Sequence, residues 1–143
     1  MIDFYPNISV KLDDGAFLPE RAHDTDAGAD IKSPIAFEIP PHDSFIMQTG
    51  VHIQTPPNCV TMVKSKSGLN IKYGITSEGV IDEGFSGEII VKLYNNSNMY
   101  HHFDRGDKIT QIVVMPVLYP TYSESDQIQS GDRGVNGYGS TGR

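Results

Sequence analysis

The chain has 143 residues, a length typical of one ordinary domain with a single core. Its net charge of −7 argues against general nucleic-acid binding, which usually needs a basic face, yet a few local cations suffice for a small phosphorylated ligand. Hydrophobic residues make up 38% of the chain, which is lean for a globular domain and favours further burial in an oligomer.

Cysteine content and hydropathy bear on where the protein works. Cys59 is the only cysteine, so no intramolecular disulfide is possible, and a reducing compartment fits. No apolar run is long enough to span a bilayer, and the N-terminus shows no signal-peptide pattern. We therefore expect a cytoplasmic protein with no membrane partner.

Short strand-like runs bounded by Gly, Pro, Asn and Asp dominate the pattern. In chain order, the expected strands cover 8–12, 35–39, 45–49, 51–53, 60–64, 89–93 and 109–115. Helical periodicity is almost absent, and one short helix is expected after Ser67, with Ser67 as its N-cap. Many short strands separated by turn signals predict an all-β sandwich, jelly roll or barrel.

Residues 79–88, GVIDEGFSGE, predict a hairpin whose tip carries a carboxylate, Asp82, and an aromatic ring, Phe85. The backbone groups of such a hairpin suit a flat polar ligand such as the edge of a base. An ordinary turn with Asp82 and Glu83 in solvent has the same pattern, because turns are rich in Asp and Gly.

Residues 64–70, KSKSGLN, place two lysines beside Ser67 and Gly68 at a strand-to-helix corner. A cation, a hydroxyl and a helix N-terminus together attract phosphate. The P-loop pattern is absent, and a solvated turn with two surface lysines explains the residues equally well.

Two polar residues occur in apolar surroundings. Asp30 follows Gly28-Ala29 and precedes Ile31, so an inward carboxylate that orients a basic partner is expected. Gln111 lies inside the apolar run 109–115, where a buried amide needs a ligand or a neighbouring backbone group as its partner. The histidines show no metal-ligand spacing, and no Ser/His/Asp triad is evident.

The last eleven residues, RGVNGYGSTGR, combine glycines, hydroxyl side chains, an aromatic ring and two arginines. Glycine-rich backbone and arginine both favour phosphate, which predicts a mobile arm that orders over a ligand. A solvated Gly-rich tail is the alternative. Residues 123–132 are polar and lack periodicity, so the predicted organisation is a body at 1–122, a linker at 123–132 and an arm at 133–143.

Five segments in this order resemble the five motifs of the trimeric dUTP pyrophosphatases, the dUTPases. They are DAGADI at 26–31, KSGL at 66–69, GVIDEGFSGE at 79–88, GDKITQ at 106–111 and RGVNGYGSTG at 133–142. The resemblance covers most of the chain and implies an all-β jelly roll or distorted barrel, assembled as a homotrimer with shared active sites. The implied reaction is hydrolysis of dUTP to dUMP and pyrophosphate, with Mg²⁺ held by the triphosphate and water and not directly by protein side chains.

The resemblance also assigns roles to residues. Asp82 matches the carboxylate that activates the attacking water, and Asp30 matches a supporting carboxylate near the metal or the arm. Phe85 would lie against the deoxyribose. The remaining implied substrate-binding residues are Lys66, Ser67, Gly68, Thr76, Val80, Ile81, Ile90, Gln111, Arg133, Tyr138, Gly139, Ser140 and Thr141.

Three residues depart from the usual family pattern. Lys66 stands where arginine is commoner, which removes bidentate phosphate contact; Phe85 replaces tyrosine, and Tyr138 replaces phenylalanine. Two alternatives are kept: a deaminase of dCTP on the same fold, although its R-S-S-L-type motif and glutamate base are not evident, and a nucleotide-sensing trimer that binds a regulatory protein.

Overall fold

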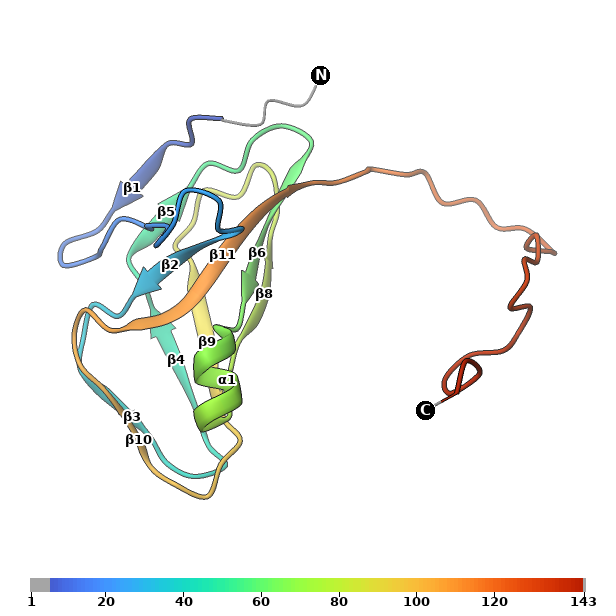
Figure 1. The fold of residues 1–143 in the computed structure, drawn as a ribbon. Coiled ribbons are helices and arrows are strands. Elements are labelled where there is room, and N and C mark those ends of the chain that lie inside the picture. The colour runs from blue at the N-terminus through green and yellow to red at the C-terminus, as the bar shows by residue number, and fades with distance from the viewer. Residues whose placement is uncertain (1–5, 143) are drawn as a thin grey trace.

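The computed structural model describes residues 6–142. Its strands are β1 (Val10–Leu12), β2 (Gly28–Lys32), β3 (Phe37–Ile39), β4 (Ser44–Gln48), β5 (Val51–Ile53), β6 (Cys59–Lys64), β7 (Ile75–Thr76), β8 (Glu78–Ile81), β9 (Ile90–Asn95), β10 (His101–Phe103) and β11 (Lys108–Pro116). One short helix, α1 (Ser67–Tyr73), follows β6 (Figure 1). The predicted all-β fold is therefore confirmed.

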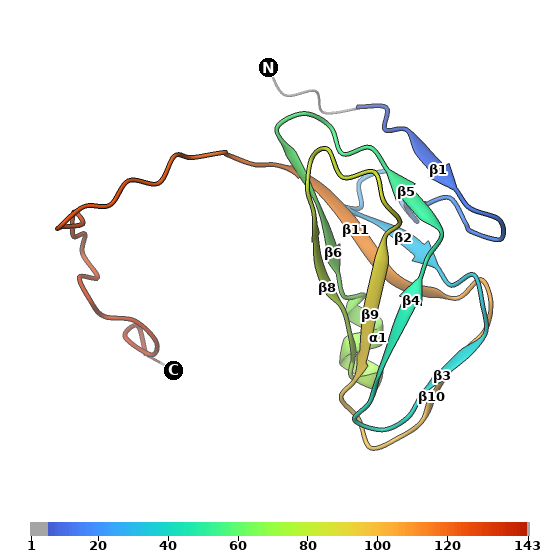
Figure 2. The same ribbon diagram turned by 180° about the vertical axis from the view of Figure 1, so that it is seen from behind.

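The strands form four small sheets. The largest has the order β2-β11-β6-β8, and a three-stranded sheet has the order β4-β9-β7. β1 pairs with β5, and β3 pairs with β10. All ladders are antiparallel, and among the described strands they do not close into one continuous hydrogen-bonded barrel (Figures 1 and 2).

Strand alternation builds the core between these sheets. β9 shows a strict exposed-buried alternation, with Val91, Leu93 and Asn95 turned inward. The buried apolar cluster draws on nearly every strand and includes Ile31, Ile39, Met47, Val63, Ile75 and Ile109. Asn95 is also buried, and its amide donates to the carbonyls of Ile39, Pro40 and Met99, so its polar side chain is satisfied inside the core.

The expected hairpin at 79–88 is wrong in one respect. β8 pairs with β6, whereas β9 pairs with β4 and β7, so residues 82–89 are a loop that passes from one sheet to the other. The apolar pattern of Val80-Ile81 and Ile89-Ile90 fits either a hairpin or such a crossing, because both sheets bury one face. β8 is consequently an edge strand of its sheet.

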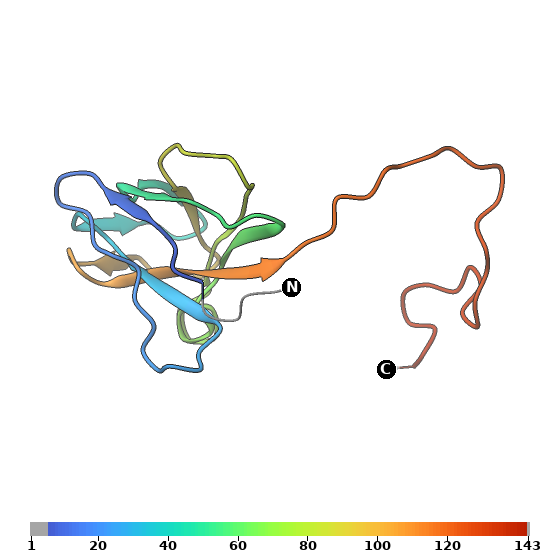
Figure 3. The same cartoon turned by 90° about the horizontal axis from the view of Figure 1, so that it is seen from above.

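Beyond β11 the chain leaves the body. Residues 118–142 are all exposed, and the segment extends away from the sheets in every view (Figure 3). Val117 still donates its backbone N–H to Asn58 O, at 2.9 Å, which fixes the point of departure. Between residues 6 and 142, no helix has the length and apolar character needed to cross a membrane.

Candidate functional site

A buried carboxylate holds two lysines at one end of the large sheet. Asp30 is 5% exposed, and its side chain accepts from Lys66 Nζ and, at 3.1 Å, from Lys108 Nζ. Burial raises the pKa of Asp30, but the hydrogen bonds and charges of Lys66 and Lys108 outweigh it and leave the pKa lowered. Asp30 therefore stays ionised and fixes two ammonium groups side by side.

Lys108 was missed by the sequence reading because a β-bulge places it. In β11, Gln111 pairs with Asp30 and Thr110 with Ile31, but Lys108 pairs with Lys32, one residue out of register. Regular alternation would put Lys108 on the face opposite Gln111. The bulge returns it to the face of Asp30, a change that period-two patterning does not reveal.

Gln111 lies beside this cluster. Its Nε2 donates to Ser65 O at 2.9 Å, so a neighbouring backbone carbonyl already satisfies one of its two amide hydrogens. A Cβ built on Gly28 would stand 2.0 Å from Gln111 Oε1, so a larger residue at this position would displace the amide. The glycine of DAGADI thus makes room for the glutamine of GDKITQ.

Helix α1 begins at this corner, but not with the cap expected. The N-cap is Lys66, in extended conformation, and it has no side-chain capping bond, so the expected capping role of Ser67 is wrong. Ser67 is the first helical residue, and both Ser67 and Gly68 are exposed. The backbone N–H groups of the first helical turn have no intrahelical acceptor and remain available to an anion.

A network of hydroxyl groups fixes the same corner and was not anticipated. Ser65 Oγ donates to Ser77 O at 3.0 Å, and Ser77 Oγ lies 2.8 Å from Thr110 Oγ1. Thr110 Oγ1 in turn donates to Lys64 O at 3.0 Å. Ser77 and Thr110 are 1% and 0% exposed, so the network ties the end of β6 and the start of β8 to β11. Ser and Thr residues that are far apart in the chain give no sequence signal that they form a hydrogen-bonded network.

Asp82 lies at the opposite end of the β6–β8 pair. It is exposed and directly follows β8, whose Ile81 pairs with Thr61. Among residues 6–142, no hydrogen bond or ion pair holds its carboxylate. Phe85 N donates to Asp82 O at 3.2 Å, and the Phe85 ring lies over Gly87, where an added Cβ would stand 2.5 Å from Phe85 Cζ.

Glu83 anchors the start of this loop. It accepts from Asn58 N at 2.7 Å and from Tyr119 Oη at 2.6 Å, which connects the loop to the residue before β6 and to the segment after β11. The hydrogen bond to Glu83 raises the pKa of Tyr119 to about 12, and the Tyr119 and Asn58 hydrogen bonds lower the pKa of Glu83. Glu83 is thus a structural partner here, whereas Asp82 is left open to solvent.

The strand residues proposed to hold a base are arranged as follows. Val80 and Ile90 are exposed, at 63% and 54%, but the Ile81 side chain is buried in the core, so only its backbone could meet a ligand. Thr76 is half-buried in β7, where its Oγ1 accepts from Asn96 at 3.0 Å. The free edge of β8 presents backbone donors and acceptors that no described strand uses.

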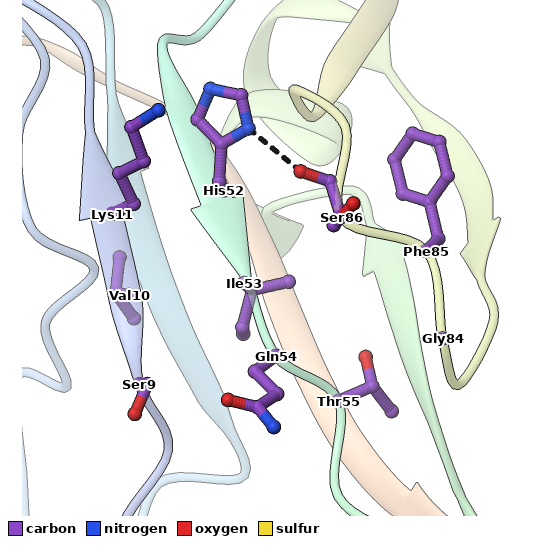
Figure 4. A pocket seen from close by; sticks show the side chains of 10 residues that line it. All are labelled: Ser9, Val10, Lys11, His52, Ile53, Gln54, Thr55, Gly84, Phe85 and Ser86. Carbon is purple, nitrogen blue, oxygen red and sulfur yellow. Dashed lines mark hydrogen bonds between the residues drawn. The ribbon is translucent and has the colours of Figure 1, made fainter.

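A cavity of about 450 Å³ adjoins the loop. It is lined by β1, β5 and residues 84–86, and Phe85 and His52 stand at its edge (Figure 4). His52 Nδ1 donates to Ser86 O across 2.9 Å, which links β5 to the loop.

Within one chain the two halves of the site are far apart. Asp82 follows the residue that pairs with Thr61, whereas Lys66 follows the far end of β6. The five residue steps from Thr61 to Lys66 span on the order of 15 Å or more of extended chain. The arm is separate again: Tyr138 is fully exposed, and Arg133 donates to Asn136 O, Gly137 O and Ser140 Oγ within the arm itself. The structure thus groups Asp30, Lys66, Ser67, Gly68 and Gln111, and separately Asp82 and Phe85, but it does not bring Arg133, Tyr138, Gly139, Ser140 or Thr141 to either group.

Comparison with known families explains this set of residues. The family model described as dUTPase matches residues 14–142, nearly the whole chain. The chain belongs to the dUTPase family. Family membership identifies it as a hydrolase and confirms the resemblance of the five motifs.

Curated relatives of this dUTPase-family chain cover nearly its full length. A protein of Clostridium acetobutylicum named deoxyuridine 5'-triphosphate nucleotidohydrolase is 40% identical over 95% of this chain and 97% of its own. Another of the same name, from Gloeothece citriformis, is 39% identical over 93% of this chain and 94% of its own.

Solved structures of phage dUTPases share the fold. A mutant dUTPase of Staphylococcus bacteriophage 80alpha, in complex with dUpNHpp, is 26% identical over 97% of this chain and 100% of its own, with a TM-score of 0.89. A mutant dUTPase of phage phi11 of S. aureus that coordinates a structural Mg(II) ion is 25% identical over 85% of this chain and 98% of its own, with a TM-score of 0.78. The jelly-roll expectation agrees with these structural relatives.

Proposed function

We propose that the protein hydrolyses dUTP to dUMP and pyrophosphate, and thereby keeps uracil out of DNA and supplies dUMP for dTMP synthesis. The observation that carries the proposal is the exposed Asp82 carboxylate after β8, in a chain that carries all the dUTPase motifs in order. Asp82 accepts a proton from a water molecule that attacks the α-phosphorus in line with the leaving pyrophosphate. An ionised carboxylate within hydrogen-bond reach of water is what this role requires.

The triphosphate is bound at the other group. Lys66 and Gln111 donate to the α- and β-phosphates, together with Ser67 and Gly68 at the start of α1. Asp30 orients Lys66, and Lys108 adds a second ammonium group 3.1 Å from Asp30. Two fixed cations stabilise the charge that develops on the phosphate oxygens, and little covalent work is left for the protein.

Uracil and deoxyribose are recognised around the loop after β8. Backbone groups near Val80, Ile81 and Ile90 hold the base edge, and Thr76 in β7 also contacts the substrate. The Phe85 ring lies against the sugar and leaves no room for a 2′-hydroxyl. Arg133, Gly139, Ser140 and Thr141 close over the γ-phosphate, while Tyr138 stacks on uracil.

The separation of the two groups supports a homotrimer with shared sites. A water at the α-phosphorus and the cations on the α-phosphate must lie within a few ångströms of each other, whereas Asp82 and Lys66 of one chain are on the order of 15 Å apart or more. We therefore propose that Asp82 of one subunit meets the phosphate-binding group of a second. The exposed segment 118–142 is long enough to bring the arm from a neighbouring subunit.

Magnesium is proposed to arrive with the triphosphate. Among residues 6–142, no group of three or more His, Cys, Asp or Glu residues could hold a metal ion, and Asp30 is already engaged by two lysines. This donor set fits an ion that keeps its waters and takes phosphate oxygens, as Mg²⁺ commonly does. Bound in this way, the ion neutralises triphosphate charge.

The deciding experiment measures pyrophosphate release from dUTP, UTP, dTTP and dCTP, with and without magnesium. The proposal requires dUTP to be strongly preferred and magnesium to accelerate the reaction. Ammonia release from dCTP would instead identify a deaminase. Binding of a regulatory protein without turnover of any of the four nucleotides would identify a sensor. We also propose a cytoplasmic location, with which the free thiol of Cys59 is compatible.

A further inference from the structure

The His52 side chain lies between the turn after β1 and the loop that carries Phe85. It lies in β5, with its side chain 20% exposed, and its Nδ1 is 2.9 Å from Ser86 O (Figure 4). Its Nε2 is 3.0 and 3.1 Å from the two carboxylate oxygens of Asp13, in the turn after β1. The imidazole therefore bridges the N-terminal turn and the loop.

Both partners of His52 are acceptors. A backbone carbonyl and an ionised carboxylate cannot donate, so the ring satisfies both only when each nitrogen carries a hydrogen. The hydrogen bond to Ser86 O and that to Asp13 both raise the pKa of His52, while partial burial and Lys11 oppose the shift. A further carboxylate, that of Glu88, accepts from Gly50 N at 2.9 Å.

The bond to Ser86 controls a specific part of the loop. Ile89 N donates to Val51 O at 2.8 Å, and Glu88 accepts from Gly50, so these contacts fix the C-terminal end of the loop. Ser86 lies between Phe85 and Gly87, the residue on which the Phe85 ring rests. A bond at Ser86 O thus fixes the backbone next to the aromatic ring.

We propose that His52, held by Asp13, is a positioning residue for sugar selection, and that its imidazolium fixes Ser86 and so keeps the Phe85 ring in place. The proposal rests on dUTP hydrolysis as the function. Because the pKa of His52 is raised in the folded protein, the clamp is complete at low pH and is lost as the pH rises through that value, above the ordinary 6.5. Discrimination between dUTP and UTP should weaken over the same interval.

The test compares His52→Gln and Asp13→Asn with the control His102→Gln. His102 also contacts carboxylates, those of Asp104 and Glu38, but it lies in β10 and away from the loop. The measurements are the ratio of kcat/KM for dUTP over UTP from pH 5.5 to 9, ¹⁵N imidazole spectra, and amide exchange of residues 83–88 without ligand.

We expect His52→Gln to lower the dUTP/UTP ratio roughly two- to tenfold at pH 6, the equivalent of one hydrogen bond, and to speed amide exchange in the loop. The wild-type ratio should fall with rising pH, in step with the His52 nitrogen spectra, and Asp13→Asn should move that fall to lower pH. His102→Gln should leave the ratio and the loop exchange unchanged.

Two results would overturn the proposal. One is an unaltered ratio and unaltered loop exchange in both His52→Gln and Asp13→Asn. The other is a His52 ring that is neutral at pH 6. The spectra and the exchange rates need no turnover, so they test the clamp even if the protein proves not to hydrolyse dUTP, and Asp13→Asn tests it if His52→Gln does not fold.

Discussion

At the scale of single residues, environment separates two carboxylates that look alike in sequence. Asp30 is buried and neutralised by Lys66 and Lys108, so its charge serves to orient cations. Asp82 is exposed, and no described residue pairs with it, so its charge remains available to a water molecule. Both residues follow short apolar runs, and only their surroundings assign them different tasks.

Replacement of Asp82 tests its proposed role directly. Asp82→Asn keeps the shape of the side chain but cannot accept a proton, so kcat should fall at least ~10²-fold while a non-hydrolysable dUTP analogue still binds. Steady-state kinetics and calorimetry give the two quantities. Asp24→Asn, another exposed aspartate, should behave as wild type, and a near wild-type kcat in Asp82→Asn would refute the assignment.

Replacement of Asp30 should appear in the pH dependence of stability. Its pKa is lowered in the folded protein, so the stabilisation is present above the unfolded value near 3.8 and is lost as the pH falls through the lower folded value. We expect Asp30→Asn to lower the free energy of unfolding by about 1–3 kcal/mol at pH 7 and to flatten its decline in acid. Urea unfolding between pH 2 and 7 measures the free energy of unfolding at each pH. If that free energy falls in acid as steeply in Asp30→Asn as in the wild type, the ion-pair explanation is contradicted.

At the scale of elements, the loop at 82–89 depends on a glycine as much as on its aromatic residue. A Cβ at Gly87 would stand 2.5 Å from Phe85 Cζ, so Gly87→Ala must displace the ring. Gly87→Ala and Phe85→Ala should therefore both lower the ratio of kcat/KM for dUTP to kcat/KM for UTP. Gly131→Ala, where an added Cβ meets nothing within 4 Å, is the control. An unchanged ratio in both loop variants would place sugar discrimination elsewhere.

The elements also show how far sequence reasoning reaches. Alternating and short apolar runs predicted most strands, but not β2, β7 or β10. β9 follows the alternation throughout because one face is buried along its whole length. The pattern did not predict which strand pairs with β8. A hairpin between β8 and β9 and a loop that passes from one sheet to the other would bury the same residues. The pattern missed Lys108 because a bulge changes the face of that side chain, and it missed the Ser77–Thr110 contact because buried hydroxyl pairs have no periodic signature. The motif resemblance named the site residues, but the placement of Asp82 and Lys66 at opposite ends of β6 required coordinates.

At the scale of the whole molecule, mixed trimers test whether sites are shared. Asp82→Asn and Lys66→Ala should each be nearly inactive alone. After joint unfolding and refolding at equal ratio, a site works only if its Asp82 and its Lys66 come from different variants. For random assortment in a closed ring, roughly a quarter of sites qualify, so activity should recover towards that fraction of wild type. Persistent inactivity despite verified mixing would show that Asp82 and Lys66 act within one chain.

The distance between Asp82 and Lys66 in one chain has a genetic consequence. If sites are shared as proposed, each site takes its Asp82 from one subunit and its Lys66 from another. A chain lacking only Asp82, coexpressed in equal amount with the intact chain, disables roughly half of the sites, in simple proportion. A chain lacking both residues disables every site that it enters on either side, so only about a quarter survive. The doubly defective allele is therefore partly dominant over the intact one, although its chain contributes no working residue of its own to any site.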